Sequence, residues 1–330
     1  MNNFKKIGMT ALAASLVSTS VFAGELTATG SASLTVEGYS GNGLASNTAY
    51  SMADSVTLGG STELDNGLTV SMAFELDGDA ESGTSAYDDN SLTISSDALG
   101  TLKFSAHGGS SATSAIDATA AGNIWDTFDG TAAVDGLANG LTSDGVTDGN
   151  ATSGENSFHY TAPAMIDGLA LMASLNTGQG TANTGHNSIG WATTYTGFDG
   201  LSVSYGISDI NTGLASTAGD QTVMKASYAY GPVTLAYSEN EIDLGLATTD
   251  KITTSWGLSY TVSDALSVTY GVETIDLRGA TDAEYEGITA SYTAGGMTVK
   301  LTSQEAKDID NTVDNNNDYD YWALGLSFAF

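Results

Sequence analysis

The chain has 330 residues, with 39 acidic against 8 basic side chains and a formal net charge of −31 at pH 7. A chain this negative repels phosphate groups, which excludes a nucleic-acid partner. It contains no cysteine, which excludes disulfide frameworks, thiolate metal sites and cysteine nucleophiles. The hydrophobic share of 41% is ordinary, so the composition does not predict disorder and the apolar side chains need an environment that shields them from water.

Residues 1–23 have the pattern of a secretory signal peptide. Lys5 and Lys6 give a positive start, residues 7–21 are mostly apolar and small, and Ala23 supplies the small residue at the expected cleavage site. The alternative, an N-terminal membrane anchor, is less favoured because serine and threonine interrupt a stretch that is short for a span. We therefore expect the signal peptide at 1–23 to be removed, and 24–330 to form the folded protein.

Alternation of apolar and polar residues is the dominant signal after residue 23. Residues 68–76 have apolar side chains at every even position, residues 201–208 have them at the odd positions, and residues 251–262 repeat the alternation. A period of two predicts β-strands with one apolar and one polar face. No later run of apolar residues is long enough for a transmembrane helix.

Short and long connections alternate along the chain. The short ones carry tight-turn residues at 65–67, 97–100, 166–168, 198–200, 231–232, 263–265 and 294–296. The long ones, rich in Gly, Asp, Asn and Ser, lie near 38–48, 77–89, 109–155, 177–187, 211–220, 241–250, 277–283 and 306–317. These fifteen connections join sixteen strands and place both chain ends on the side of the short turns.

The two faces of each strand decide between a soluble sandwich and a membrane barrel. A sandwich buries its apolar faces in a core, whereas a membrane barrel turns them toward lipid and encloses water with its polar faces. The polar faces here are small and rich in Ser, Thr and Gly, as a wet interior requires. Aromatic residues on the apolar faces near the short turns suit an interfacial girdle: Tyr195, Tyr230, Tyr237, Tyr260 and Tyr292. The sequence therefore predicts an all-β fold, a 16-stranded antiparallel transmembrane β-barrel.

Three segments resemble the Gram-negative general porins, especially the alphaproteobacterial type. Residues 156–163, followed by the turn at 167–168, resemble the family's N-S-x-x-Y-x-(S/A)-P strand. Residues 99–104 resemble the strand before the family's long third loop, although the closing glycine is delayed to Gly108. Residues 321–330 end in Phe with apolar residues at alternate positions, like the family's terminal strand.

The resemblance implies a trimeric outer-membrane channel of a Gram-negative bacterium, with short periplasmic turns and long extracellular loops. Small hydrophilic solutes and ions would diffuse through it passively. Its third loop would fold inward, which here assigns residues 109–155 as the constriction loop. Within that loop we expect Asp126 and Asp129 nearest the narrowest point, because Trp125 and Phe128 are suited to anchor the loop on the wall.

The basic residues give further candidates for the pore lining. Lys103, Lys225, Lys251 and Lys300 all lie at the polar parity of their strands, as does His159. We expect these side chains to point into the lumen, where cations opposite the loop carboxylates would create a transverse field. Because most acids lie in the long connections, the outer mouth should be negative and the pore should prefer cations.

Signatures of enzymes are absent: the chain has no G-x-S-x-G, H-E-x-x-H or Gly-rich phosphate-binding motif. We therefore expect no catalysis and no cofactor. Clustered carboxylates at Asp308, Asp310 and Asp314 are weak candidates for loop-bound Ca²⁺, although a solvated acidic loop is favoured because no complete EF-hand is present. Two alternatives stay open: a substrate-specific channel on the same barrel and an acidic secreted or surface β-rich adhesin.

Overall fold

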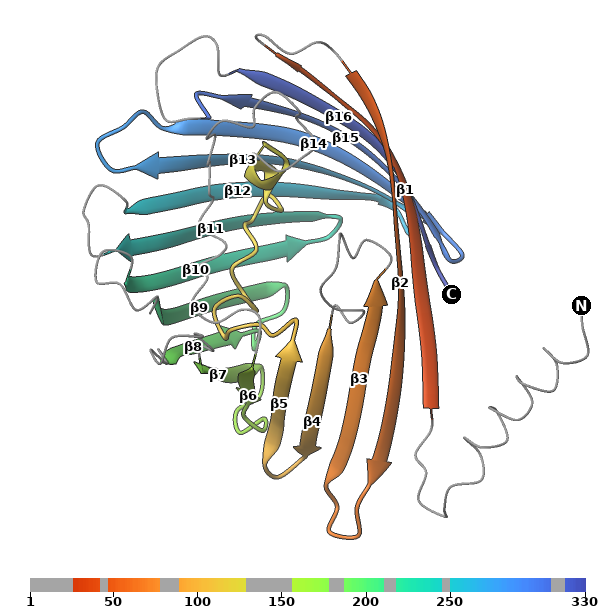
Figure 1. Ribbon diagram of the computed structural model, residues 1–330. Helices are drawn as coiled ribbons and strands as arrows, with labels where there is room; N and C mark the ends of the chain where they lie inside the picture. Colours follow the sequence, from red (N-terminus) through yellow and green to blue (C-terminus); the bar gives the residue numbers. More distant parts are fainter. Residues whose placement is uncertain are drawn as a thin grey trace, which may run out of the picture.

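Sixteen antiparallel strands form one closed barrel in the computed structural model, in which every strand pairs with its chain neighbours and β1 closes the sheet against β16 (Figure 1). The described residues are 26–41, 47–77, 89–128, 156–177, 187–210, 218–244, 250–309 and 318–330. The elements are β1 (Leu26–Gly41), β2 (Asn47–Glu63), β3 (Thr69–Asp77), β4 (Asn90–Ser96), β5 (Gly100–His107), the 3₁₀ helix η1 (Ile124–Phe128), β6 (Ser157–Thr161), β7 (Leu169–Thr177), β8 (Asn187–Tyr195), β9 (Leu201–Ile210), β10 (Gly219–Tyr230), β11 (Val233–Leu244), β12 (Lys251–Ser263), β13 (Leu266–Leu277), β14 (Ala283–Ala294), β15 (Met297–Lys307) and β16 (Tyr319–Ala329).

The apolar faces of the strands point outward. On β9, Val203 and Tyr205 are 42% and 46% exposed, whereas the intervening Ser204 is buried. The same alternation recurs on β8, where the outward Trp191 is exposed and the inward Ser188 is buried. A sandwich would bury its large side chains in a dry centre, so the predicted barrel is confirmed and the soluble alternative is wrong.

Predicted turns and connections lie where the strands end. Short turns join β2 to β3, β4 to β5 and each later pair at one end of the barrel. Gly200 and Gly295 adopt φ values of +74° and +61° in two of these turns, where a residue with a Cβ would be strained.

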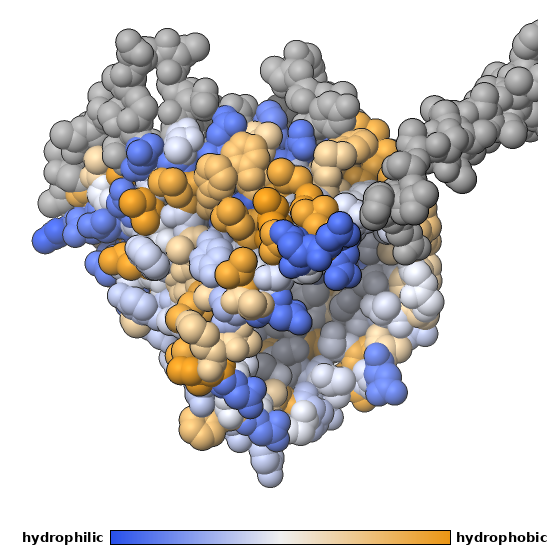
Figure 2. All heavy atoms as spheres, turned by 90° about the horizontal axis from the view of Figure 1, so that it is seen from below, coloured by the Kyte–Doolittle hydropathy of each residue, from blue (hydrophilic) through white to orange (hydrophobic). Residues whose placement is uncertain are grey.

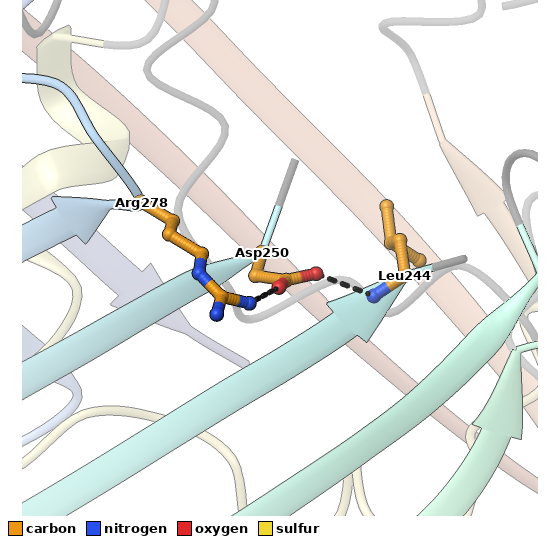
Figure 3. A network of polar contacts seen from close by, with 3 residues as sticks. All are labelled: Leu244, Asp250 and Arg278. Carbon is orange, nitrogen blue, oxygen red and sulfur yellow. Dashed lines mark hydrogen bonds and ion pairs between the residues drawn. The ribbon is translucent and has the colours of Figure 1, made fainter. Parts of the chain in front are cut away.

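At the opposite end, Asp250 joins three strands. It accepts a hydrogen bond from the backbone N–H of Leu244 at 3.1 Å and one from the Arg278 guanidinium at 2.9 Å (Figure 3). This contact ties the last residue of β11 and the segment after β13 to the start of β12.

Large apolar side chains cover much of the outer surface. Figure 2 shows hydrophobic side chains gathered in patches on the face it presents, with hydrophilic ones between them. Aromatic residues lie near the short turns, including Tyr230, Tyr260 and Tyr292, which are 77%, 49% and 46% exposed. Within the described ranges, no helix is long and apolar enough to cross a membrane.

The strands differ in length around the barrel. β1 and β2 have 16 and 17 residues, and β9 to β16 have 10 to 13. By contrast, β4, β5 and β6 have only 7, 8 and 5 residues. The wall is therefore lowest at β4–β6.

Candidate pore constriction

The segment after β5 turns into the barrel and runs along its inner wall. Residues 108–128 leave the end of β5, cross the inner faces of successive strands and finish in η1 beside β13 and β14 (Figure 1). This segment is the described part of the predicted constriction loop, which we call the inner loop. Its inward course agrees with the expectation from the family resemblance.

Side chains of the wall bind the backbone of the inner loop. Near its start, the carbonyl oxygen of Ser110 lies 3.3 Å from Nδ1 of His159 on β6, and the N–H of Ala112 donates to Ser174 on β7 at 2.9 Å. The hydroxyl of Thr113 then lies 3.0 Å from the hydroxyl of Ser208 on β9. The loop lies outside regular secondary structure, so its backbone groups need other hydrogen-bond partners. The polar faces of the strands supply them.

Lys225 on β10 holds the middle of the inner loop. Its Nζ donates to the carbonyl oxygen of Ala118 at 2.5 Å, and the carboxylate of Asp117 is an electrostatic neighbour. Beside it, the amide of Asn240 on β11 donates to the carbonyl oxygen of Asp117 at 2.6 Å. Lys225 therefore lies between the wall and the loop. A transverse field across the pore requires cations on the part of the wall that faces the loop across the open lumen, and Lys225 is not one of them.

Two further residues of the loop, Ala120 and Ala121, bind serine hydroxyls. The N–H of Ala120 donates to Ser238 on β11 at 2.8 Å, and the N–H of Ala121 donates to Ser255 on β12 at 2.9 Å. Consecutive loop residues thus bind consecutive strands, so at this point the loop crosses the wall by one strand per residue.

η1 ends the inner loop in a small hydrophobic cluster inside the barrel. Trp125 and Phe128 are 4% and 1% exposed, and they pack with side chains from β13 to β16. The Phe128 ring lies 6.0 Å from the ring of Tyr285 and 6.4 Å from that of Tyr39, whose hydroxyl donates to the Thr127 carbonyl at 3.0 Å. The two aromatic residues predicted to anchor the loop therefore contact the wall.

Glycines on the inner face make room for the loop. A Cβ built on Gly257 would lie 2.1 Å from the carbonyl oxygen of Ala120, and one on Gly271 would lie 2.4 Å from Cβ of Ala121. On β9, a Cβ on Gly206 would lie 3.0 Å from the side chain of Ile116. The loop therefore lies as close to the wall as backbone contact permits, and it does so because these positions lack side chains.

The predicted lining residues lie on the inner face at separate places. Lys103 pairs with His159 across β5 and β6, on the face where Ser174 binds the loop. Lys300 pairs with Gly325 and shares the inner face of β15 and β16, and Lys251 begins β12 at the inner parity of Ser255. Among the described residues, Lys103 is the lysine on the wall β2–β5. Their contribution to conduction remains a prediction.

The predicted loop carboxylates are described only in part. Asp126 is exposed on η1. Asp129 lies outside the described residues, as do Asp310 and Asp314, whereas Asp308 follows the end of β15. Within the described part of the chain, no group of three or more His, Cys, Asp or Glu side chains is arranged to hold a metal ion, so loop-bound Ca²⁺ remains an untested prediction.

The sequence reasoning missed two features of the site. Glu273 on β13 is 1% exposed and binds the inner loop, but its position at the polar parity gave no sign that it is covered. Alternation alone does not distinguish the inward glycines from the small polar residues of the lumen. Gly206, Gly257 and Gly271 all lie in the middle of strands and on the inner face. Such recurring glycines are the sequence signal that a chain segment passes over the wall at those positions.

The barrel has a polar interior, which the inner loop narrows from one side. The wall β2–β5 is lined largely by small hydroxyl side chains such as Ser51 and Ser55 on β2 and Thr93 on β4. Ser31 and Ser55 contact each other there at 3.0 Å. Such groups hydrate readily and offer no deep apolar site for a ligand.

Comparison with known proteins supports the same reading. The family description "Gram-negative porin" matches residues 8–330, whereas no curated protein sequence matches the chain. Among solved structures, an anion-selective porin from Comamonas acidovorans has a TM-score of 0.65 at 17% identity, covering 93% of this chain and 99% of its own.

Two further structures have the same fold. OmpF of Salmonella typhi in complex with daunomycin has a TM-score of 0.64 at 15% identity, covering 93% of this chain and 98% of its own. A substituted form of the Rh. blastica porin has a TM-score of 0.62 at 20% identity, covering 93% and 100%. With the family match spanning nearly the whole chain and a closed barrel that encloses an inner loop, this protein belongs to the Gram-negative porin family and is an outer-membrane channel for passive diffusion.

Proposed function

We propose that this porin admits ions and small hydrophilic solutes with a preference for cations, and that it catalyses no reaction. The observation that carries the proposal is a hydroxyl-lined interior, closed all round by strands and narrowed by an internal loop, inside a barrel whose outer face is apolar. A bound substrate would require converging donors or apolar contacts. The serine and threonine hydroxyls of the wall β2–β5 can donate and accept, but they are spread along several strands and form no deep apolar site, so size and charge should decide which solutes pass.

The charges on the inner face favour cations. Apart from Glu273, which the loop covers, the described inner face and inner loop carry the carboxylates of Glu37, Glu63, Glu75, Asp77, Asp117 and Asp126, against Lys103, Lys225, Lys251 and Lys300. One of these cations, Lys225, is bound to the loop carbonyl of Ala118. An excess of negative charge in a confined aqueous pore raises the local concentration of cations.

Reversal potentials test the preference. In planar bilayers with a tenfold KCl gradient, we expect stepwise conductance and a reversal potential with the sign of potassium selectivity, which weakens as salt screens the pore charges. Liposome swelling with a series of neutral sugars should show a rate that falls smoothly with solute size. Chloride selectivity would contradict the cation preference, and a rate that singles out one solute would favour a substrate-specific channel on the same barrel.

We further propose that copies of the chain associate through the wall β4–β6, in the homotrimer that the family resemblance implies. A transmembrane strand requires about 9–11 residues, so strands of 7, 8 and 5 residues are too short to face lipid alone. The described outer face of β3–β6 carries no charge. Outward carboxylates on the remaining wall would repel a second copy, namely Asp54, Asp209, Asp220, Glu239, Glu241, Asp243, Asp276, Glu284, Glu286, Glu305 and Asp320.

Cross-linking from single cysteines tests this interface, because the natural chain contains none. Leu92→Cys places a thiol on the outer face of β4 and Leu258→Cys places a matched one on β12, since the two leucines are 43% and 46% exposed. With a short bifunctional maleimide, we expect covalent dimers from the first variant and none from the second. Equal yields from both variants, or dimers from Leu258→Cys alone, would contradict the proposed wall.

A further inference from the structure

A buried carboxylate joins the far half of the inner loop to the barrel. Glu273 lies on the inner face of β13 and is 1% exposed. Its Oε1 accepts a hydrogen bond from the hydroxyl of Thr119, and its Oε2 accepts one from the N–H of Trp125 at 2.9 Å. Ser255 on the neighbouring strand points its hydroxyl at Oε1 from 3.4 Å. One side chain therefore binds both ends of the loop turn at 119–125.

That turn is a closed unit that has its own internal bonds. The N–H of Thr119 donates to the side chain of Asn123 at 2.8 Å, and the N–H of Asn123 donates back to the hydroxyl of Thr119 at 2.7 Å. Asn123 takes the left-handed conformation, with φ of +56°, which asparagine tolerates better than most residues. The turn thus keeps its shape, and Glu273 determines where it sits on the wall.

Among the described residues, hydrogen bonds alone satisfy the carboxyl oxygens of Glu273. Within the described part of the chain, no lysine or arginine forms an ion pair with it. A buried carboxyl group without a cation is unfavourable unless several donors converge on it, and the two nearest donors here come from the loop itself. Loss of the carboxylate would therefore leave the N–H of Trp125 and the hydroxyl of Thr119 without their acceptor.

We propose that Glu273 is the positioning residue that sets the width of the pore, an inference that rests on the proposed diffusion function. The loop already touches the wall at Gly257 and Gly271, so a released turn has no room to move outward. Its displacement is confined to the interior, where it reduces the open cross-section. Neighbouring contacts of Lys225 and Ser238 hold the first half of the loop, so the change is confined to the half that contains η1.

The experiment compares Glu273→Ala and Glu273→Gln with Glu286→Ala in single-channel recordings of the full chain. Glu286 is a matched control because it lies on the adjacent strand, paired with Val272, but on the outer face. We expect Glu273→Ala to lower the mean conductance about twofold and to add open-channel flicker, because ion flow follows the open cross-section. Glu273→Gln keeps an acceptor oxygen and the side-chain volume, so it should restore most of the conductance. Glu286→Ala should match the parent.

Two measurements keep the outcome interpretable. All variants should stay folded in detergent, because the strand ladder is unchanged, although Glu273→Ala should unfold somewhat more easily since two donors lose their acceptor. In liposome swelling with a series of sugars, the largest sugar that still passes should be smaller for Glu273→Ala than for the parent and the other variants. A quiet channel of parental or larger conductance in folded Glu273→Ala would overturn the inference and leave the diffusion function intact, whereas a parent chain that conducts no current would overturn the function itself.

Discussion

Replacing Gly257 by alanine is expected to lower the single-channel conductance by about half, because ion flow through a water-filled pore follows its open cross-section. The added methyl group would lie 2.1 Å from the carbonyl oxygen of Ala120, a backbone atom that no rotamer change can move away. The loop must shift by more than 1 Å to reach an ordinary contact distance. Because β12 lies behind it, the shift is inward.

Gly325→Ala is the matched control for this prediction. Gly325 lies on the inner face of β16, where the nearest atom to an added Cβ is Cβ of Lys300 at 3.9 Å. The two substitutions add the same methyl group at the same strand parity, and only one of them meets the loop. Bilayer recordings should therefore separate them, with Gly325→Ala at the parental conductance. Equal conductance for Gly257→Ala and the parent, in folded barrels, would show that the loop does not rest on β12.

The same collision should weaken the hydrogen bonds beside it. The N–H of Ala120 donates to Ser238 and that of Ala121 donates to Ser255, and both bonds lengthen if the loop moves away. The segment would then be free to fluctuate, so the lower conductance of Gly257→Ala should be accompanied by flicker. Glycine at this position thus fixes both the place and the steadiness of the constriction.

The strand architecture follows from local rules, which is why the sequence predicts it well. Alternation assigns each residue to a face, so Val203 and Ser204 are placed correctly from their neighbours alone. Turn residues such as the Gly200 with positive φ mark where each strand ends. The strict succession of short turns and long connections then predicts the number of strands and their antiparallel order.

The path of the inner loop depends on contacts between residues that are far apart in the sequence. The alternation of apolar and polar residues along a strand does not predict such contacts. Glu273 and Lys225 have the same inner parity as Lys300, yet the first two lie under the loop and the third does not. A parity rule places a side chain inside the barrel without showing what covers it. The aromatic residues were more informative, because Trp125 and Phe128 are large apolar groups in a polar segment and require a buried site.

Alternate faces of β12 should differ sharply in their contact with water. Leu258 and Tyr260 point outward and are 46% and 49% exposed, whereas Ser259 and Thr261 point inward, clear of the inner loop. The chain contains no cysteine, so a thiol placed at each of these four positions is the sole reactive group. A charged maleimide reacts with thiols in water and is excluded from hydrocarbon. Labelling therefore reports the medium that each side chain faces.

Thiol labelling of these four cysteine variants in planar bilayers, with current recorded before and after the charged reagent, tests most directly whether the polar faces enclose a conducting aqueous pore. We expect Ser259→Cys and Thr261→Cys to react and to lose current, because the bound label occupies the pore. Leu258→Cys and Tyr260→Cys should remain unlabelled at unchanged current. Reaction and loss of current at 258 and 260 with none at 259 and 261 would contradict the account, because the apolar face would then line the water-filled space.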